Sequence, residues 1–321
     1  MKNKQLVCVV LCVWGLFAAG TVFSQPAVES VTIYAIRGPS GVGMIRLFEN
    51  PPQIEGLQVR AEALAQADLV AAKFIAGEAK IGILPPNIAA KIASSGRDIQ
   101  IAAIVGTGML SLLTTDPAVT RVEDLAGKTV EAAGQGATPD YVIRRILTSK
   151  GLNPGVDVSL NYTLAYPEIA QSLIAGRVTT ALLPEPFATM ALAGREDLRA
   201  VGDIQAEWVH AGGGANYPMT ALVVDAGFAR ERPDAVRAVL AAYQSSTEWV
   251  TAHPAEAGAL VEKHNWGLRA AVISAAIPKS NYVFIPAREA RPAVEALFRT
   301  FLEYAPESIG GALPGDSFYW H

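Results

Sequence analysis

Cysteine is almost absent from this chain of 321 residues: Cys8 and Cys12 both lie in its first apolar segment. Once that segment is removed, the chain has no disulfide, no thiol nucleophile and no Cys-ligated zinc. No two of the four histidines are three or four positions apart, which argues against a zinc site on a helix. No G-x-S-x-G, P-loop or S-x-x-K motif is present. We therefore expect no catalytic residue, no metal and no cofactor.

Charged residues are also scarce. They make up 17% of the chain, against 51% hydrophobic residues, and the formal net charge of −4 comes without any cluster of Lys and Arg. Nucleic-acid binding needs basic side chains gathered on one face, so we expect no nucleic-acid partner. The length and the apolar content suffice for two globular lobes, each with its own core.

The amino terminus has the pattern of an exported signal peptide. Two lysines precede an apolar run over residues 6–19, and Val22-Phe23-Ser24 supplies small residues before a cleavage point. We expect residues 1–24 to be removed after Ser24 and the protein to be periplasmic. The alternative is an uncleaved membrane anchor, for which the run is short.

One segment of the chain occurs twice. Residues 74–85 read FIAGEAKIGILP and residues 173–184 read LIAGRVTTALLP. In each copy an apolar helical run ends at Ile-Ala-Gly, and a β-type run then stops at Leu-Pro. Gly77 and Gly176 suit the left-handed residue that closes a helix, while a proline suits the carboxyl end of a strand.

The similarity extends upstream of both copies. Residues 57–64 and 158–164 are strand-like, and residues 34–48 and 128–147 each read as a strand, a Gly-rich turn and a helix. The sequence therefore predicts two βαβαβ half-molecules with a ligand crevice at the carboxyl ends of the strands. Chance similarity between ordinary βα units is the alternative.

Two glycine-interrupted segments indicate crossings between lobes. Residues 99–115 are a long β-type run broken by Gly106 and Gly108, and the loop-rich stretch 207–224 ends in a strand. Such segments are typical of hinges. We expect an α/β protein with a two-strand hinge, whose first lobe is formed by residues 29–113 and 216–321 and whose second is formed by residues 114–215.

In the first lobe, the candidate ligand contacts follow predicted strands. Ser40 and Gly41 lie in a Gly-rich turn, where Ser40 can cap a helix beginning near Val42 and free backbone N–H groups can face a ligand. The alternative is a turn that binds nothing. Asn87 follows the first repeat, and it can cap the next helix, contact the ligand, or do both.

In the second lobe, Gly134, Gln135 and Gly136 form a second Gly-rich turn, and Thr138 stands at the cap position of a helix start. We expect this turn to face the turn of the first lobe across the crevice. Tyr166 lies between a strand and a helix, where its ring either contacts the ligand or packs under the loop.

The remaining candidates lie at a strand end and near the second hinge crossing. Glu185 can accept a hydrogen bond from a ligand or cap the following helix. Near the hinge, aromatic and amide groups are suited to a pocket, although Trp208 could equally be structural packing. The candidates there are Trp208, Asn216 and Tyr217.

These features together resemble a known group of proteins. The export pattern, the paired βα units, the stretch VEDLAGKTV and the strand end ALLPEPF are similar to solute-binding components of ABC importers in the nitrate/sulfonate/taurine and thiamine-precursor group. The resemblance covers essentially the whole mature chain and implies the two-lobed type II periplasmic binding fold. In each lobe it implies a mostly parallel sheet flanked by helices.

The resemblance also implies a function. A small solute would be captured between two closing lobes and delivered to an ABC permease in the inner membrane, with the binding protein acting as a monomer. The chain departs from typical sulfonate and nitrate binders because only Arg37 is a cation near the expected pocket loops, so a neutral heterocycle rivals an oxyanion as ligand. The alternative is an enzyme on the same fold, like chorismate-dehydrating or pyrimidine-forming enzymes, which are cytoplasmic and lack an export leader.

Overall fold

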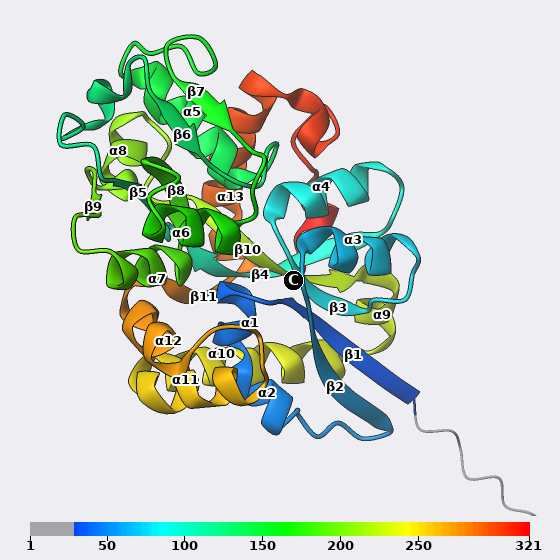
Figure 1. Cartoon of the computed structure of the whole chain (residues 1–321). Helices are drawn as coiled ribbons and strands as arrows, with labels where there is room; N and C mark the ends of the chain where they lie inside the picture. The colour runs from blue at the N-terminus through cyan, green and yellow to red at the C-terminus, as the bar shows by residue number, and fades with distance from the viewer. Residues whose placement is uncertain (1–28) are drawn as a thin grey trace, which may run out of the picture.

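Two β-sheets divide the chain into two lobes (Figure 1). The structure, a computed structural model, describes residues 29–321. The expected signal peptide, residues 1–24, lies outside the described residues. Within them, no helix combines the length and the apolar character needed to cross a membrane.

The first sheet has six strands in the order β11-β4-β10-β3-β1-β2. β1 runs parallel to β2 and β3, whereas β10 runs antiparallel to β3 and β4. β3 consists of four buried residues, IGIL, which fits a strand covered on both faces. The strand bounds are β1 Glu29–Ile36, β2 Leu57–Leu64, β3 Ile81–Leu84, β4 Ile99–Thr107, β10 Pro218–Asp225 and β11 Tyr282–Pro286.

The second sheet repeats this plan with five strands in the order β7-β6-β8-β5-β9. β6 runs parallel to β7 and β8, and β5 then pairs antiparallel with β8. Each sheet thus has three parallel strands followed by an antiparallel one, as expected of a duplicated half-molecule. The strand bounds are β5 Leu110–Thr114, β6 Thr129–Glu131, β7 Ser159–Asn161, β8 Thr180–Pro184 and β9 Arg199–Ala200.

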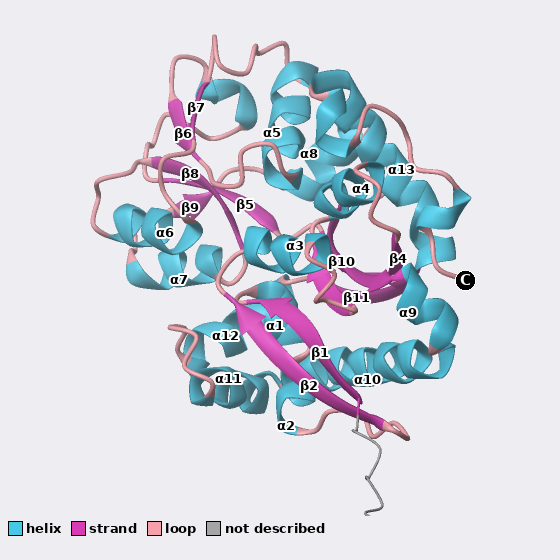
Figure 2. Cartoon of the chain, turned by 90° about the vertical axis from the view of Figure 1, so that its right-hand side faces the viewer, coloured by secondary structure: helices cyan, strands magenta, loops and turns pink. Residues whose placement is uncertain are grey.

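Helices cover both faces of the sheets. In the second lobe, Ala181 and Leu183 of β8 pack in the cluster that contains α6 and α7 residues, while Leu182 packs with α5 and α8 residues. This alternation is the period of a strand buried on both sides, and Figure 2 shows the helix pairs on opposite sides of the strands. The helix bounds here are α5 Thr138–Ser149, α6 Tyr166–Ile174, α7 Phe187–Gly194 and α8 Ile204–His210.

The first lobe carries the remaining α-helices. α2 and α10 contribute residues to the cluster on one face of its sheet, and α3, α4 and α13 contribute residues to the cluster on the other. The bounds are α1 Pro39–Gly43, α2 Ile45–Glu49, α3 Ala67–Ile75, α4 Pro86–Ser94, α9 Ala226–Glu231, α10 Pro233–Ala252, α11 Pro254–Lys263, α12 Ala270–Ala276 and α13 Ala287–Tyr304.

The two copies of the repeated segment form equivalent elements, α3–β3 and α6–β8. Gly77 and Gly176 have φ of 79° and 73°, which confirms the predicted left-handed helix closure. In both copies an arginine from further along the chain also closes the helix. Arg97 donates to the carbonyl of Phe74 at 3.2 Å, and Arg195 donates to the carbonyl of Leu173 at 2.9 Å.

The chain crosses between the lobes beside Gly108. The Gly108 N–H donates to the carbonyl of Tyr217 at 3.1 Å, which joins the outgoing and returning crossings. β5 pairs only with strands of the second sheet, so the boundary expected between residues 113 and 114 falls inside β5. The crossing lies at residues 108–109 because the glycine, with φ of 44°, is where the strand turns.

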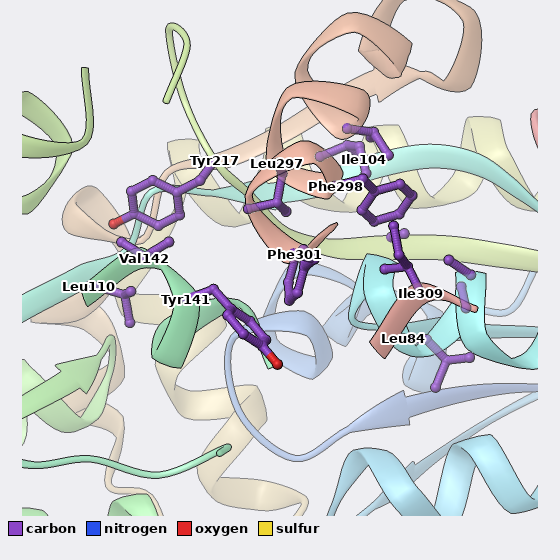
Figure 3. Close-up of a cluster of buried hydrophobic side chains, with 14 of the residues drawn as sticks. Leu84, Ile104, Leu110, Tyr141, Val142, Tyr217, Leu297, Phe298, Phe301 and Ile309 are labelled. Carbon is purple, nitrogen blue, oxygen red and sulfur yellow. The ribbon is translucent and has the colours of Figure 1, made fainter. Parts of the chain in front are cut away.

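The carboxyl-terminal helix α13 contacts both lobes. It packs against the first sheet, and Phe301 also meets Tyr141 of α5 edge-on, with ring centroids 4.4 Å apart. Figure 3 shows these rings in one buried cluster that includes Leu84 from the first lobe and Leu110 from the second. The assignment of residues 216–321 to the first lobe alone therefore omits a contact with the second.

Candidate ligand-binding site

A cavity of about 1000 Å³ lies where the two lobes face each other. The first lobe supplies the starts of α1, α3 and α4 to its wall, and the second supplies the starts of α5, α6 and α7. These helices follow strands, so the cavity lies at the carboxyl edges of both sheets, as the duplicated βα units predict.

The cavity wall contains many of the predicted contacts and comes from both lobes. The structure brings together on it Ser40, Asn87, Gly134, Gln135, Gly136, Thr138 and Tyr166. Their contact with a ligand stays a prediction. The convergence itself shows that the two Gly-rich turns, distant in sequence, border one space.

The other candidates lie outside the wall. Gly41 packs inward, since a Cβ there would lie 2.8 Å from the carbonyl oxygen of Ile36 and 2.9 Å from the ring of Trp266. Glu185 is buried and accepts a hydrogen bond from the Thr189 N–H at 3.1 Å, which is the capping alternative. Burial raises the pKa of Glu185.

The three candidates near the second hinge crossing serve the hinge and the core. Trp208 and Tyr217 are fully buried and meet edge-on at 5.5 Å, and Figure 3 shows Tyr217 within the cluster that α13 joins. Asn216 donates through Nδ2 to the Thr107 hydroxyl at 3.0 Å, beside the crossing at Gly108. The two aromatic residues beside the hinge therefore pack in the core, which is the structural alternative stated for Trp208.

The predicted capping roles of Ser40, Thr138 and Asn87 are wrong. α1 begins at Pro39, before Val42, and the Ser40 hydroxyl donates to the carbonyl of Ile36. Thr138 is the first residue of α5, and Ala137 is its cap. Asn87 lies inside the first turn of α4, after the cap residue Pro85. Pro39 and Pro86 occupy the first positions of α1 and α4, so these helices begin before Ser40 and Asn87. In α5 the proline, Pro139, follows Thr138 and does not account for the earlier start.

Asn87 makes a contact that joins the lobes. Its Nδ2 donates to the carbonyl of Gly136 at 3.1 Å, so a side chain of α4 touches the Gly-rich turn of the second lobe. Asn87 is 3% exposed, and the bond is partly buried. The structure thus places the lobes in contact at this point of the cavity wall.

A buried carboxylate holds the second Gly-rich turn in place. Asp140 accepts hydrogen bonds from the Gly136 N–H at 2.8 Å, from Arg144 Nε at 2.5 Å and from the hydroxyl of Tyr162. Burial raises the pKa of Tyr162, which stays a neutral donor. The sequence did not predict this role for Asp140.

Two aromatic rings provide an apolar part of the wall. The rings of Tyr166 and Phe187 are stacked with centroids 6.1 Å apart and an interplanar angle of 17°. The Tyr166 hydroxyl donates to the carbonyl of Ala133 at 3.0 Å, which fixes the ring. Phe187 follows a predicted strand end, and that position was the available signal for it.

Among residues 29–321, no group of three His, Cys, Asp or Glu residues could hold a metal ion.

A model of the NMT1-like family matches residues 58–263, more than half of the chain. The chain belongs to the NMT1-like family. Among the curated proteins compared with it, none matches this member of the family.

Solved structures similar to this NMT1-like protein include an ABC transporter structure and two periplasmic binding proteins. An ABC transporter structure from Parabacteroides distasonis is 27% identical, with a TM-score of 0.78 over 91% of this chain and 99% of that one. The periplasmic aliphatic sulphonate binding protein SsuA from Escherichia coli is 17% identical, with a TM-score of 0.73 over 91% and 92% of the two chains.

The periplasmic nitrate-binding protein NrtA from Synechocystis PCC 6803 is 13% identical, with a TM-score of 0.65 over 91% and 84% of the two chains. Such distant likenesses show the fold, which is the expected two-lobed periplasmic binding fold. Family and fold together support the interpretation as a solute-binding protein over that as an enzyme.

Proposed function

We propose that this NMT1-like protein is the periplasmic solute-binding component of an ABC importer and that it holds a small organic solute between its lobes. The observation that carries the proposal is the cavity of about 1000 Å³ whose wall is shared by both lobes. That volume suits a small molecule, and the contact between Asn87 and Gly136 across the lobes supports a closed conformation.

Ligand capture would work through the hinge. Gly108 and Tyr217 join the two crossings, so rotation there separates the walls without disrupting either sheet. A solute that contacts both lobes binds the closed form better than the open form and shifts the equilibrium toward closure. The closed form would then be recognised by the permease, with the binding protein acting as a monomer that is exported after cleavage at Ser24.

Native mass spectrometry of the protein taken from a periplasmic fraction tests this proposal. We expect the mass of a chain that begins at Gln25, and a second species that is heavier by the mass of one small organic molecule. A chain that keeps residues 1–24, or a protein that carries no solute and gains no thermal stability from any solute tested, would contradict the proposal.

A substitution at Gly136 tests whether the ligand binds in this cavity. Gly136 has φ of 75°, so Gly136→Val costs about 1–2 kcal/mol of backbone strain and puts a branched side chain on the cavity wall. We expect the rise in melting temperature that a bound solute produces by mass action to disappear, while circular dichroism shows an intact fold.

Gly127→Val is the matched control. Gly127 has nearly the same φ, 74°, with no atom within 4 Å of an added Cβ, and it lies outside the cavity wall. The control should lose similar stability and keep the ligand-induced shift. Normal solute binding by Gly136→Val would mean that the ligand lies elsewhere.

A further inference from the structure

Two buried polar atoms on the cavity wall have no hydrogen-bond partner. They are Oδ1 of Asn87 and Oγ1 of Thr138, and the two residues are 3% and 1% exposed. They come from opposite lobes, and both residues line the cavity. A buried polar atom without a partner costs about 1–3 kcal/mol, so a ligand that pairs with these atoms removes an existing penalty.

The orientation of the Asn87 amide decides what such a ligand must offer. Nδ2 faces the carbonyl of Gly136 at 3.1 Å, because only the NH₂ group can donate to that oxygen. The unpartnered Oδ1 is therefore an acceptor and needs a donor. Ionised sulfonate and nitrate groups have acceptor oxygens only, so neither can supply that bond.

The helix starts of the second lobe are already occupied by carboxylates. Asp140 of α5 accepts from the Gly136 N–H at 2.8 Å, and Glu168 of α6 accepts from the Ala165 N–H at 3.0 Å. Helix amino ends attract anions through such N–H groups. Here each start has its own anion, so the second lobe offers a bound anion little attraction.

The charges on the wall give no preference for an anion either. The wall contains Arg37 and Lys91, together with Asp68 and Glu307, and all four side chains are exposed. Two cationic side chains are thus matched by two anionic ones. Solvent and salt also weaken the interaction of exposed side-chain charges with a bound ion. The part of the wall that the second lobe contributes contains no charged residue.

We infer that the ligand of this cavity is an uncharged solute that carries at least one N–H or O–H donor, which pairs with Oδ1 of Asn87. The hydroxyl of Thr138 pairs with a second polar atom of the solute, and the apolar body of the solute lies against the rings of Tyr166 and Phe187. This inference rests on the proposed function, and it separates this protein by ligand class from the sulphonate- and nitrate-binding proteins that share its fold.

Matched pairs of solutes test the inference. The probes are amides and sulfonamides with their carboxylates and sulfonates: nicotinamide and nicotinate, benzamide and benzoate, benzenesulfonamide and benzenesulfonate, together with nitrate. Thermal shift and isothermal titration are measured at low and at high salt. We expect the uncharged member of a pair to bind at least tenfold more tightly, with a dissociation constant that salt changes by less than twofold.

Variants connect the preference to Asn87. Asn87→Leu removes the acceptor and should weaken binding of the uncharged probe at least tenfold, whereas the exposed Asn153→Leu, outside the cavity wall, should leave it unchanged. If Asn87→Leu does not fold, Thr138→Val replaces it, with a loss of similar direction expected.

The possible outcomes separate the two proposals. An anion that binds more tightly than its uncharged partner, and loses binding in Gly136→Val, overturns the inference while the proposed function stands. Equal binding of the uncharged probe by wild type and Asn87→Leu also overturns the inference. Failure of every probe, combined with native protein that carries no solute, overturns the proposed function and the inference with it.

Discussion

Glu185 is a buried carboxylate at the start of α7, and its environment makes a pH-dependent prediction. Burial raises its pKa in the folded protein, although its bond from Thr189 opposes the shift. A group whose folded pKa is raised stabilises the protein at low pH and loses that contribution as the pH rises through the folded pKa. The folded protein therefore bears a growing cost at Glu185 above pH 4.5.

We expect Glu185→Gln to be more stable, relative to wild type, at pH 8 than at pH 4, with the gain levelling off once the pH exceeds the raised pKa of Glu185 in the folded protein. Glutamine keeps an acceptor for the Thr189 N–H and cannot ionise. Urea midpoints at pH 4, 6 and 8 measure the difference, and the exposed Glu196→Gln is the control. A stability difference that is constant over this range would contradict the environment described for Glu185.

At the residue scale, the sequence predicted the positions of polar residues better than it predicted their contacts within the protein. Asn87 was found because it follows a strand, but its partner Gly136 is 49 residues away in sequence. Trp208 was a pocket candidate because of its residue type. Its burial depends on Gly213, where an added Cβ would lie 2.1 Å from the indole ring, and such a contact has no local sequence signal.

At the scale of elements, the repeated helix closure shows what could be predicted. The pattern Ile-Ala-Gly gave the left-handed closure of α3 and α6, because glycine is the residue that adopts positive φ without strain. The arginines that complete each closure, Arg97 and Arg195, lie about 20 residues beyond the glycines and reach them only through the fold. The sequence therefore did not predict the contacts of these two arginines with the helix ends.

This closure predicts an effect of Gly176→Ala. A Cβ at Gly176 would lie 2.9 Å from Nη1 of Arg195, which donates to the carbonyl of Leu173. The variant combines backbone strain with a displaced arginine, so we expect it to lose more than the roughly 1–2 kcal/mol of strain alone. Urea unfolding gives the free energy of unfolding.

Gly151→Ala provides the comparison. Gly151 has φ of 76° and no atom within 4 Å of an added Cβ, so its substitution measures strain without crowding. Equal losses for Gly151→Ala and Gly176→Ala would show that the contact with Arg195 contributes nothing to the stability of the closure.

At the scale of the whole molecule, the duplication predicted two lobes and a cavity between them. The sequence did not predict the bridge formed by α13, because its contacts join residues distant along the chain. Arg145 of α5 pairs with Glu303 of α13 at 3.1 Å, and the two rings of Tyr141 and Phe301 meet beside it. Opening of the cavity must therefore either keep these contacts as a pivot or break them.

A crystal structure of the protein with the solute it carries from the periplasm tests the central claim most directly. We predict density for a small molecule in the cavity between the lobes, within hydrogen-bond distance of Asn87 Oδ1 and of the Thr138 hydroxyl. Density for the carried solute outside this cavity, with the space between the two Gly-rich turns empty, would contradict the account.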